Sequence, residues 1–350
     1  MTDHPLVAAA RELAADLLEP VAAEVDQNAV PRGHLDAIAK VGLLGVVAPQ
    51  AAGGADAGPA VLREVTEHLA GADAATWFVQ AQHHSPVRML AANPSESADR
   101  YLHQLASGEL IAGIAFSHLR RFPQRPVTAT RTRGGWRFHG VAPWYTGWTL
   151  NDVAFIAGVS DDEQVVFGIA PAQPGAGLSA KTKLRTAALD AAQTVVLQID
   201  NMKVDDADIA LVQPVGDWLA TDRQTSANAN AAIFGVASSA VRLLAKAGDE
   251  RNEPATQDAA AKLGARLVDV REKAYALADD DGERIDERLA ARAEALEVLI
   301  AVTTALVAAN SGPAMALTHP AQRKAREALF LLVQAQTAAA RAATLRRWAP

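Results

Sequence analysis

The first part of the chain carries apolar residues at helical spacing. Leucine or valine recurs at every fourth position from Leu13 to Val25, which predicts a helix over residues 5–30. Pro20 lies inside this helix. Because proline has no N–H and clashes with the preceding turn, we expect a kink or a break there. The same reasoning predicts further helices over Pro31–Gly42, Val61–Ala70, Ala74–Ala92 and Ser95–Leu105, with a Gly-rich loop at Ala51–Pro59.

The pattern changes near Leu110. From there to Pro214 the chain consists of short runs that are β-branched or alternate between apolar and polar residues, separated by Gly, Pro and Asp. These runs predict a β-domain, with a hairpin turn at Gly134–Gly135. Helical periodicity then returns and continues to Arg347. The predicted breaks in this last part lie at Asn252–Thr256, Asp279–Gly282 and Asn310–Pro313.

This order of helices, strands and helices predicts segregated domains rather than an alternating α/β sheet. We expect a mainly α member of the α+β class with three domains. Residues 1–110 form a helical domain, residues 111–213 a β-barrel-like domain, and residues 214–350 a four-helix bundle. No GxGxxG or GxxxxGK motif follows a predicted strand, so neither a Rossmann site nor a P-loop is expected.

Composition narrows the function classes. The 350 residues include 40 acids and 33 bases, a formal net charge of -7, which argues against nucleic acid as a partner. Cysteine is absent, so disulfides and thiolate chemistry are excluded. We expect a cytoplasmic protein without a signal peptide or a membrane span, because the longest apolar stretch, near Ala295–Ala309, contains Glu297 and is short.

Three stretches, in the same order along the chain, resemble the acyl-CoA dehydrogenase family. The N-terminal stretch is LLEPVAAEVDQNAVPRGHLDAIAKVGLLGVVAPQAAGG, with Pro20, Asp26 and Pro31 at the positions of the family signature. The middle stretch is GWRFHGVAPWYTG, and the C-terminal stretch is SGPAMALTHPAQRKAREALFLLVQAQT. Together they span most of the chain, and their joint agreement identifies the fold.

The resemblance implies a chemistry. Members of this family bind FAD and oxidise an acyl-CoA thioester between its α and β carbons, and a glutamate removes the α-proton. Such a base must be desolvated so that its pKa approaches that of the substrate. The family also packs its C-terminal bundles into dimers and tetramers, which implies a homo-oligomer or a hetero-oligomer with a related chain. It names no metal, and the histidines have no metal-ligand spacing.

Several residues match the family's flavin contacts. Trp144 and Thr146 correspond to a Trp-x-Thr in which the Trp packs beside the flavin ring and the Thr hydroxyl reaches N5. The alternative is a buried Trp in a hairpin followed by a β-favouring Thr. Ser117 stands where the family has a Thr whose hydroxyl serves the flavin pyrimidine edge. The alternative for Ser117 is a Ser at a strand end for reasons of turn formation.

Other family features are altered. The Gly-Ser-Asp segment that contacts diphosphate groups is replaced by SHLRRFPQRP, where the arginines Arg120, Arg121 and Arg125 either bind phosphates or are solvated surface charges. Arg251 matches an arginine that grips the FAD of a neighbouring subunit, and Gln257 stands near the position of a second contact. The Gly-rich turn has become Asn310–Pro313.

The catalytic base is the largest departure. Aligning Thr337 with the family's Glu-Gly-Thr places Ala335 at the glutamate, and alanine has no proton acceptor. A minority of the family carries the base as a Glu followed by Arg in the first C-terminal helix. Asp222 before Arg223 occupies about that place, so Asp222 is the candidate base. The alternative is an acid at a helix start, stabilised by the macrodipole without a catalytic role.

Three functional hypotheses follow. The first is an acyl-CoA dehydrogenase that uses Asp222 or a base from elsewhere. The second is a catalytically silent subunit of a hetero-oligomer, because some bacterial members pair a chain that carries the glutamate with one that lacks it. The third is a flavin-dependent monooxygenase, since such enzymes on this scaffold lack the glutamate and place His and Ser near the flavin. His83 and His84 would serve there, or form a surface or capping pair.

Overall fold

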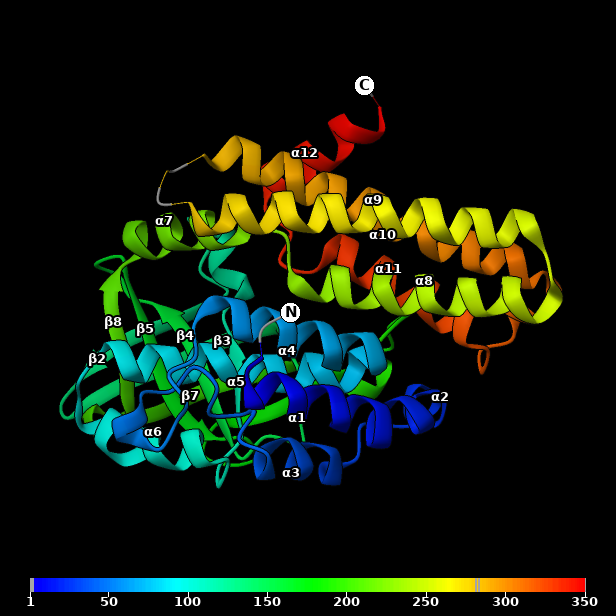
Figure 1. Cartoon of the computed structure of the whole chain (residues 1–350). Helices are drawn as coiled ribbons and strands as arrows, with labels where there is room; N and C mark the ends of the chain where they lie inside the picture. The colour runs from blue at the N-terminus through cyan, green and yellow to red at the C-terminus, as the bar shows by residue number, and fades with distance from the viewer. Residues whose placement is uncertain (1–2, 281, 283, 350) are drawn as a thin grey trace.

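The computed structural model describes residues 3–280, 282 and 284–349. Along the chain its elements follow the order helices, strands and helices (Figure 1). The N-terminal helices cover one end of the molecule beside the sheet. They are α1 (Pro5–Leu13), the π-helical turn η1 (Ala14–Leu18), α2 (Glu19–Gln27), α3 (Arg32–Lys40), α4 (Pro59–Ala72), α5 (Ala74–Ala92) and α6 (Glu96–Ser107).

Pro20 disturbs the first helix as predicted, but it does not break it. The chain widens into the single π-helical turn η1 directly before α2, in which Pro20 is the second residue. A π turn accommodates the missing N–H and the ring without ending the helix. The apolar face therefore stays continuous, with Val7, Leu18 and Val25 all buried.

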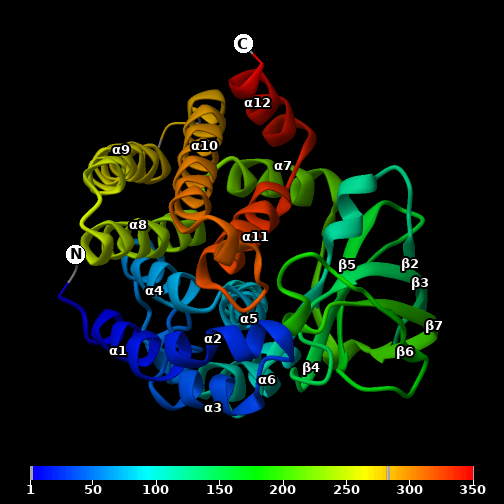
Figure 2. The same cartoon turned by 90° about the vertical axis from the view of Figure 1, so that its right-hand side faces the viewer.

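The middle of the chain forms an eight-stranded sheet in the order β6-β7-β3-β2-β4-β5-β8, with β1 pairing in parallel beside β4. The strands are β1 (Ala112–Ala115), β2 (Val127–Thr132), β3 (Gly135–Tyr145), β4 (Val153–Val159), β5 (Gln164–Pro171), β6 (Leu178–Lys183), β7 (Val195–Asp205) and β8 (Ile209–Pro214). A 3-10 turn, η3 (Ser117–Arg121), follows β1 directly. Figure 2 shows the sheet on one side of the helices.

The predicted hairpin turn lies one residue earlier than expected. Arg133 and Gly134 form the loop between β2 and β3, and Gly134 has a φ of +78°. Gly135 already belongs to β3, where it pairs with Thr132. Its lack of a side chain serves packing, because a Cβ there would lie 2.2 Å from the carbonyl oxygen of Val204.

The C-terminal part is helical, with breaks at the three predicted places. Its helices are α7 (Val215–Ser226), α8 (Ala231–Arg251), α9 (Pro254–Asp279), α10 (Ile285–Asn310), α11 (Pro320–Val333) and α12 (Ala338–Trp348). A further break between α7 and α8 was not predicted. It ends at Asn230, whose side chain accepts a hydrogen bond from the N–H of Ala232 at 3.0 Å and caps α8.

Small residues allow α8 to approach α4 closely. A Cβ at Gly235 would lie 2.3 Å from the carbonyl oxygen of Glu67, so the two backbones meet there. The run Val215–Arg251 and helix α10 are long and apolar enough to cross a membrane by length and composition alone. Within the fold they pack against each other and against α9.

Helix α11 is fixed to the N-terminal helices by buried charges. Glu327 accepts from Arg323 at 2.8 Å and from Lys324 at 2.7 Å, and all three side chains are at most 7% exposed. The two cations also donate to backbone carbonyls at the end of α4, those of Ala72 and Gly71. This cluster determines where α11, and the connection that follows it, lie in the molecule.

Candidate functional site

The end of β3 presents the predicted Trp-x-Thr segment. Alternation along the strand points Tyr145 into the core and leaves Trp144 52% exposed. Thr146 is buried, and its hydroxyl lies 3.1 Å from that of Thr194. Asn151 fixes the segment, because its amide donates to Tyr145 Oη at 3.1 Å and to the Thr146 carbonyl at 2.9 Å. The alternative of a buried Trp144 is therefore wrong.

Ser117 lies at the start of η3, which contacts β3. Its hydroxyl is buried and has no hydrogen-bond partner among the described residues. Nδ1 of the adjacent His118 is also buried and has no hydrogen-bond partner among the described residues. The other ring nitrogen, Nε2, lies 3.0 Å from the Ala157 carbonyl oxygen. Buried hydroxyls are rarely left unpaired in native proteins, so this position suits a ligand with hydrogen-bonding edges, such as a flavin.

Asp222 pairs with Arg120. Both carboxylate oxygens accept from the guanidinium at 2.8 Å, and the two side chains are only 12% and 20% exposed. The Arg120 guanidinium also lies 5.5 Å from the ring of Phe116, which packs against Trp218. Asp222 stands in the second half of α7, so the alternative of a helix-start acid is wrong. Arg120 is likewise not a solvated surface charge.

The other two arginines of the altered segment differ from Arg120. Arg125 lies in a surface ion pair, 3.2 Å from Asp161, while Arg121 is exposed. Whether either of them contacts phosphate stays a prediction.

Ala335 lies in the connection between α11 and α12, with a φ of +51°. Arg292 of α10 holds this connection, donating to the carbonyls of Gln334 at 2.8 Å and Ala335 at 3.4 Å and to that of Ser226 at the end of α7. Burial lowers the pKa of Arg292 to about 10, and the positive charge of Arg120 acts in the same direction. Ala335, which the alignment places at the family's catalytic glutamate, thus lies beside Arg292.

The two histidines of α5 are both buried, so the alternative of a surface pair is wrong. His83 accepts from the N–H of Ala112 through Nδ1 at 3.0 Å, and its Nε2 lies 3.1 Å from the Leu105 carbonyl. This arrangement fixes a neutral ring that joins α5, α6 and β1, and burial lowers its pKa to about 4. His84 has its Nε2 2.6 Å from the Gln80 amide nitrogen, and its Nδ1 has no partner among the described residues.

Arg251 lies at the last turn of α8, and its contacts are internal. It donates to the carbonyl of Ala309 and, at 2.9 Å, to Oδ1 of Asn310. These bonds tie the end of α8 to the end of α10, where helix carbonyls lack partners. Gln257 is also engaged, donating to Asp249 at 2.9 Å. The predicted contact of Arg251 with FAD stays a prediction.

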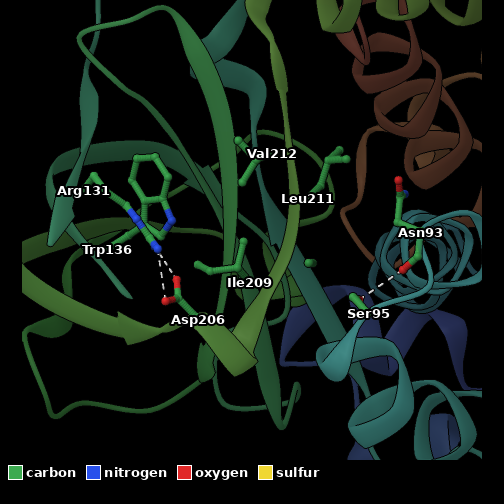
Figure 3. A pocket seen from close by; sticks show the side chains of 9 residues that line it. Asn93, Ser95, Arg131, Trp136, Asp206, Ile209, Leu211 and Val212 are labelled. Carbon is green, nitrogen blue, oxygen red and sulfur yellow. Dashed lines mark hydrogen bonds and ion pairs between the residues drawn. The ribbon is translucent and has the colours of Figure 1, made fainter. Parts of the chain in front are cut away.

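Two hollows in the β-domain were not predicted from the sequence. The larger, of about 420 Å³, lies between β8 and the segment from α5 to α6, with Arg131 stacked 5.4 Å from the centre of the Trp136 ring and paired with Asp206 (Figure 3). The second, of about 340 Å³, lies between the end of β5, the loop that follows it and the end of β7. Neither includes a predicted site residue. Among the described residues no His, Asp or Glu group could hold a metal ion.

Comparison with known proteins agrees with this architecture. Residues 2–109 match the model of the acyl-CoA dehydrogenase N-terminal domain. Butyryl-CoA dehydrogenase from Megasphaera elsdenii superimposes with a TM-score of 0.84 at 17% identity, over 100% of this chain and 99% of that one. Dibenzothiophene monooxygenase from Paenibacillus sp. A11-2 gives a TM-score of 0.82 at 18% identity, over 99% and 97%. No curated protein sequence matches the chain.

The order of helical domain, sheet and helical bundle, followed over the whole length, is the architecture of acyl-CoA dehydrogenases. Residues 2–109 thus carry the N-terminal domain of the acyl-CoA dehydrogenases, and the chain as a whole shares their fold. The similar structures include both dehydrogenases and a monooxygenase, so the fold alone leaves the reaction open.

Proposed function

We propose that this chain is a flavin-dependent oxidoreductase of the acyl-CoA dehydrogenase type, with FAD as cofactor and an acyl-CoA thioester as substrate. The observation that carries the proposal is the unpaired, buried hydroxyl of Ser117, on a turn that contacts the strand of Trp144. Ser117, Trp144 and Thr146 would hold the flavin, and Arg251 would contact the FAD of a neighbouring subunit. Bound there, FAD would supply the acceptor for a hydride from the β-carbon of the substrate.

The chain's own groups determine how the α-proton leaves. Ala335 offers no acceptor, so Asp222 is the carboxylate we propose as base. Both of its oxygens accept hydrogen bonds from Arg120, so the atoms that would take up the proton are occupied. Asp222 must release Arg120 to accept a proton. We therefore expect slow oxidation by the isolated chain.

Anaerobic titration with an acyl-CoA tests this assignment. The flavin of the wild-type protein should bleach slowly, and that of the Asp222→Asn variant should stay oxidised. Asp217→Asn is the matched control, because Asp217 is an exposed acid on the same helix. Equal bleaching in Asp222→Asn and wild type would remove Asp222 from the proposal.

A second candidate, favoured by Arg292, is a catalytically silent subunit of a hetero-oligomer. Arg292, which donates to the Ala335 carbonyl, places a positive charge beside the position of the missing glutamate. Such a chain would bind little flavin alone and would gain it when co-expressed with a related chain that carries the glutamate.

A third candidate is a flavin monooxygenase, favoured by the buried and unpaired Nδ1 of His84. Of the similar structures, the Paenibacillus monooxygenase is known as a complex with FMN and indole. Oxygen consumption that requires reduced flavin and no CoA ester would support this candidate over the first two.

A further inference from the structure

Arg292 is a buried cation with unused donors. The residue is 3% exposed and lies between the end of α7 and the connection 334–337. A guanidinium has five N–H donors. Three of them serve the carbonyls of Ser226, Gln334 and Ala335, which leaves Nε–H and one N–H of Nη2. Nε is buried and has no partner in the described part of the chain.

The charge of Arg292 is also uncompensated. No ion pair joins Arg292 to a carboxylate among the residues that the structure describes. Asp222, a carboxylate of α7, has both oxygens bound by Arg120. Arg120 itself adds repulsion, which together with burial lowers the pKa of Arg292. A buried charge without an ionic partner is costly, so this place favours an anion.

A purely structural role explains only part of this arrangement. Arg292 caps the end of α7, where cations interact well with the helix dipole. Capping α7 requires only the donors of Arg292 that face the helix carbonyls, so it does not explain the buried Nε–H. The connection that Arg292 holds contains a second buried polar atom without a partner in the described structure, Oε1 of Gln336.

We infer that Arg292 binds a carboxylate of the ligand through its free Nε–H and Nη2 donors. This pair of N–H groups forms the planar fork that matches the two oxygens of a carboxylate. Because Nε has almost no solvent contact, the ligand enters when the connection 334–337 moves. That connection already holds Ala335 in the left-handed region, which costs a non-glycine residue about 1–3 kcal/mol.

The inference rests on the proposed function for the identity of the ligand, an acyl-CoA with a free carboxylate. The anion site itself does not require flavin. Acetate is therefore the probe, and binding is measured by saturation-transfer NMR from the protein to the acetate methyl group, at constant ionic strength in chloride. Wild type should show transfer, and Arg292→Met should lose it. Arg341→Met, which removes an exposed charge from α12, should retain it.

Absence of transfer in wild type, or equal transfer in Arg292→Met, would overturn the inference. The wild-type measurement alone can refute the inference, so a misfolded Arg292→Met variant would not leave the inference untested. Arg292→Gln, which keeps a donor toward the carbonyls, gives a second neutral variant and should also lose transfer. The visible spectrum of the same samples separates the two proposals: flavin without acetate binding refutes the anion site alone, and acetate binding without flavin refutes the proposed function alone.

Discussion

Replacing Glu327 by glutamine should strongly destabilise the fold. The carboxylate is the shared partner of Arg323 and Lys324, and all three side chains are buried. A glutamine carbonyl can accept from only one of the two cations, and its NH₂ group then faces the other, donor against donor. Both buried cations lose their ionic partner, and one of them also loses its hydrogen bond to residue 327; breaking a buried ion pair in this way costs about 3–5 kcal/mol. The carbonyls of Gly71 and Ala72 stay bound, so we expect about 3 kcal/mol.

Equilibrium urea denaturation followed by far-UV circular dichroism measures this loss. Glu250→Gln is the matched control, since Glu250 is an exposed member of a surface pair with Lys246 and its removal should leave the midpoint unchanged. A Glu327→Gln midpoint equal to that of wild type would refute the reasoning. It would mean that the carboxylate does not offset the two buried cations.

Three further outcomes follow from the structure. Burial lowers the pKa of Lys324 to about 8 from 10.5. Between these two pH values the unfolded chain binds more protons than the folded protein, so the free energy of unfolding should rise with pH. Urea denaturation at pH about 8 and at pH about 10 should show a smaller rise in Lys324→Met than in wild type. Gly113→Ala places a Cβ 2.1 Å from the Asn151 amide nitrogen and should lower stability by roughly 1–3 kcal/mol in a urea titration, whereas Gly33→Ala, with open space around it, should not. Trp144→Ala should lower the flavin-to-protein absorbance ratio, and Trp348→Ala, which removes another exposed Trp, should leave it unchanged. Equal effects of the two Trp variants, or of the two Gly variants, would contradict the respective argument.

Periodicity and turn residues predicted most of the fold, because they act locally. Gly42, for example, adopts a φ of +78° just after the helix it was predicted to end. The misses arise from tertiary packing. Gly135 is glycine because the Val204 carbonyl approaches it, not because the chain turns there. The break before α8 depends on Asn230, whose cap gives only a weak signal in an Ala-rich run.

The candidate site was less predictable, since pairings across long sequence separations are invisible in a single chain. Arg120 and Asp222 are 102 residues apart and were considered separately. Arg292 carried only a weak signal, because an arginine in a polar helical stretch normally faces solvent. A hint lay in its position, one helical turn after Arg288, since both reach the carbonyl end of α7.

The visible absorption spectrum of the protein, purified after expression alone and again after incubation with excess FAD, tests the central claim most directly. We predict the paired absorption bands of bound flavin, retained through gel filtration. A protein that stays colourless in both samples would contradict the proposal that Ser117, Trp144 and Thr146 form a flavin site in this chain.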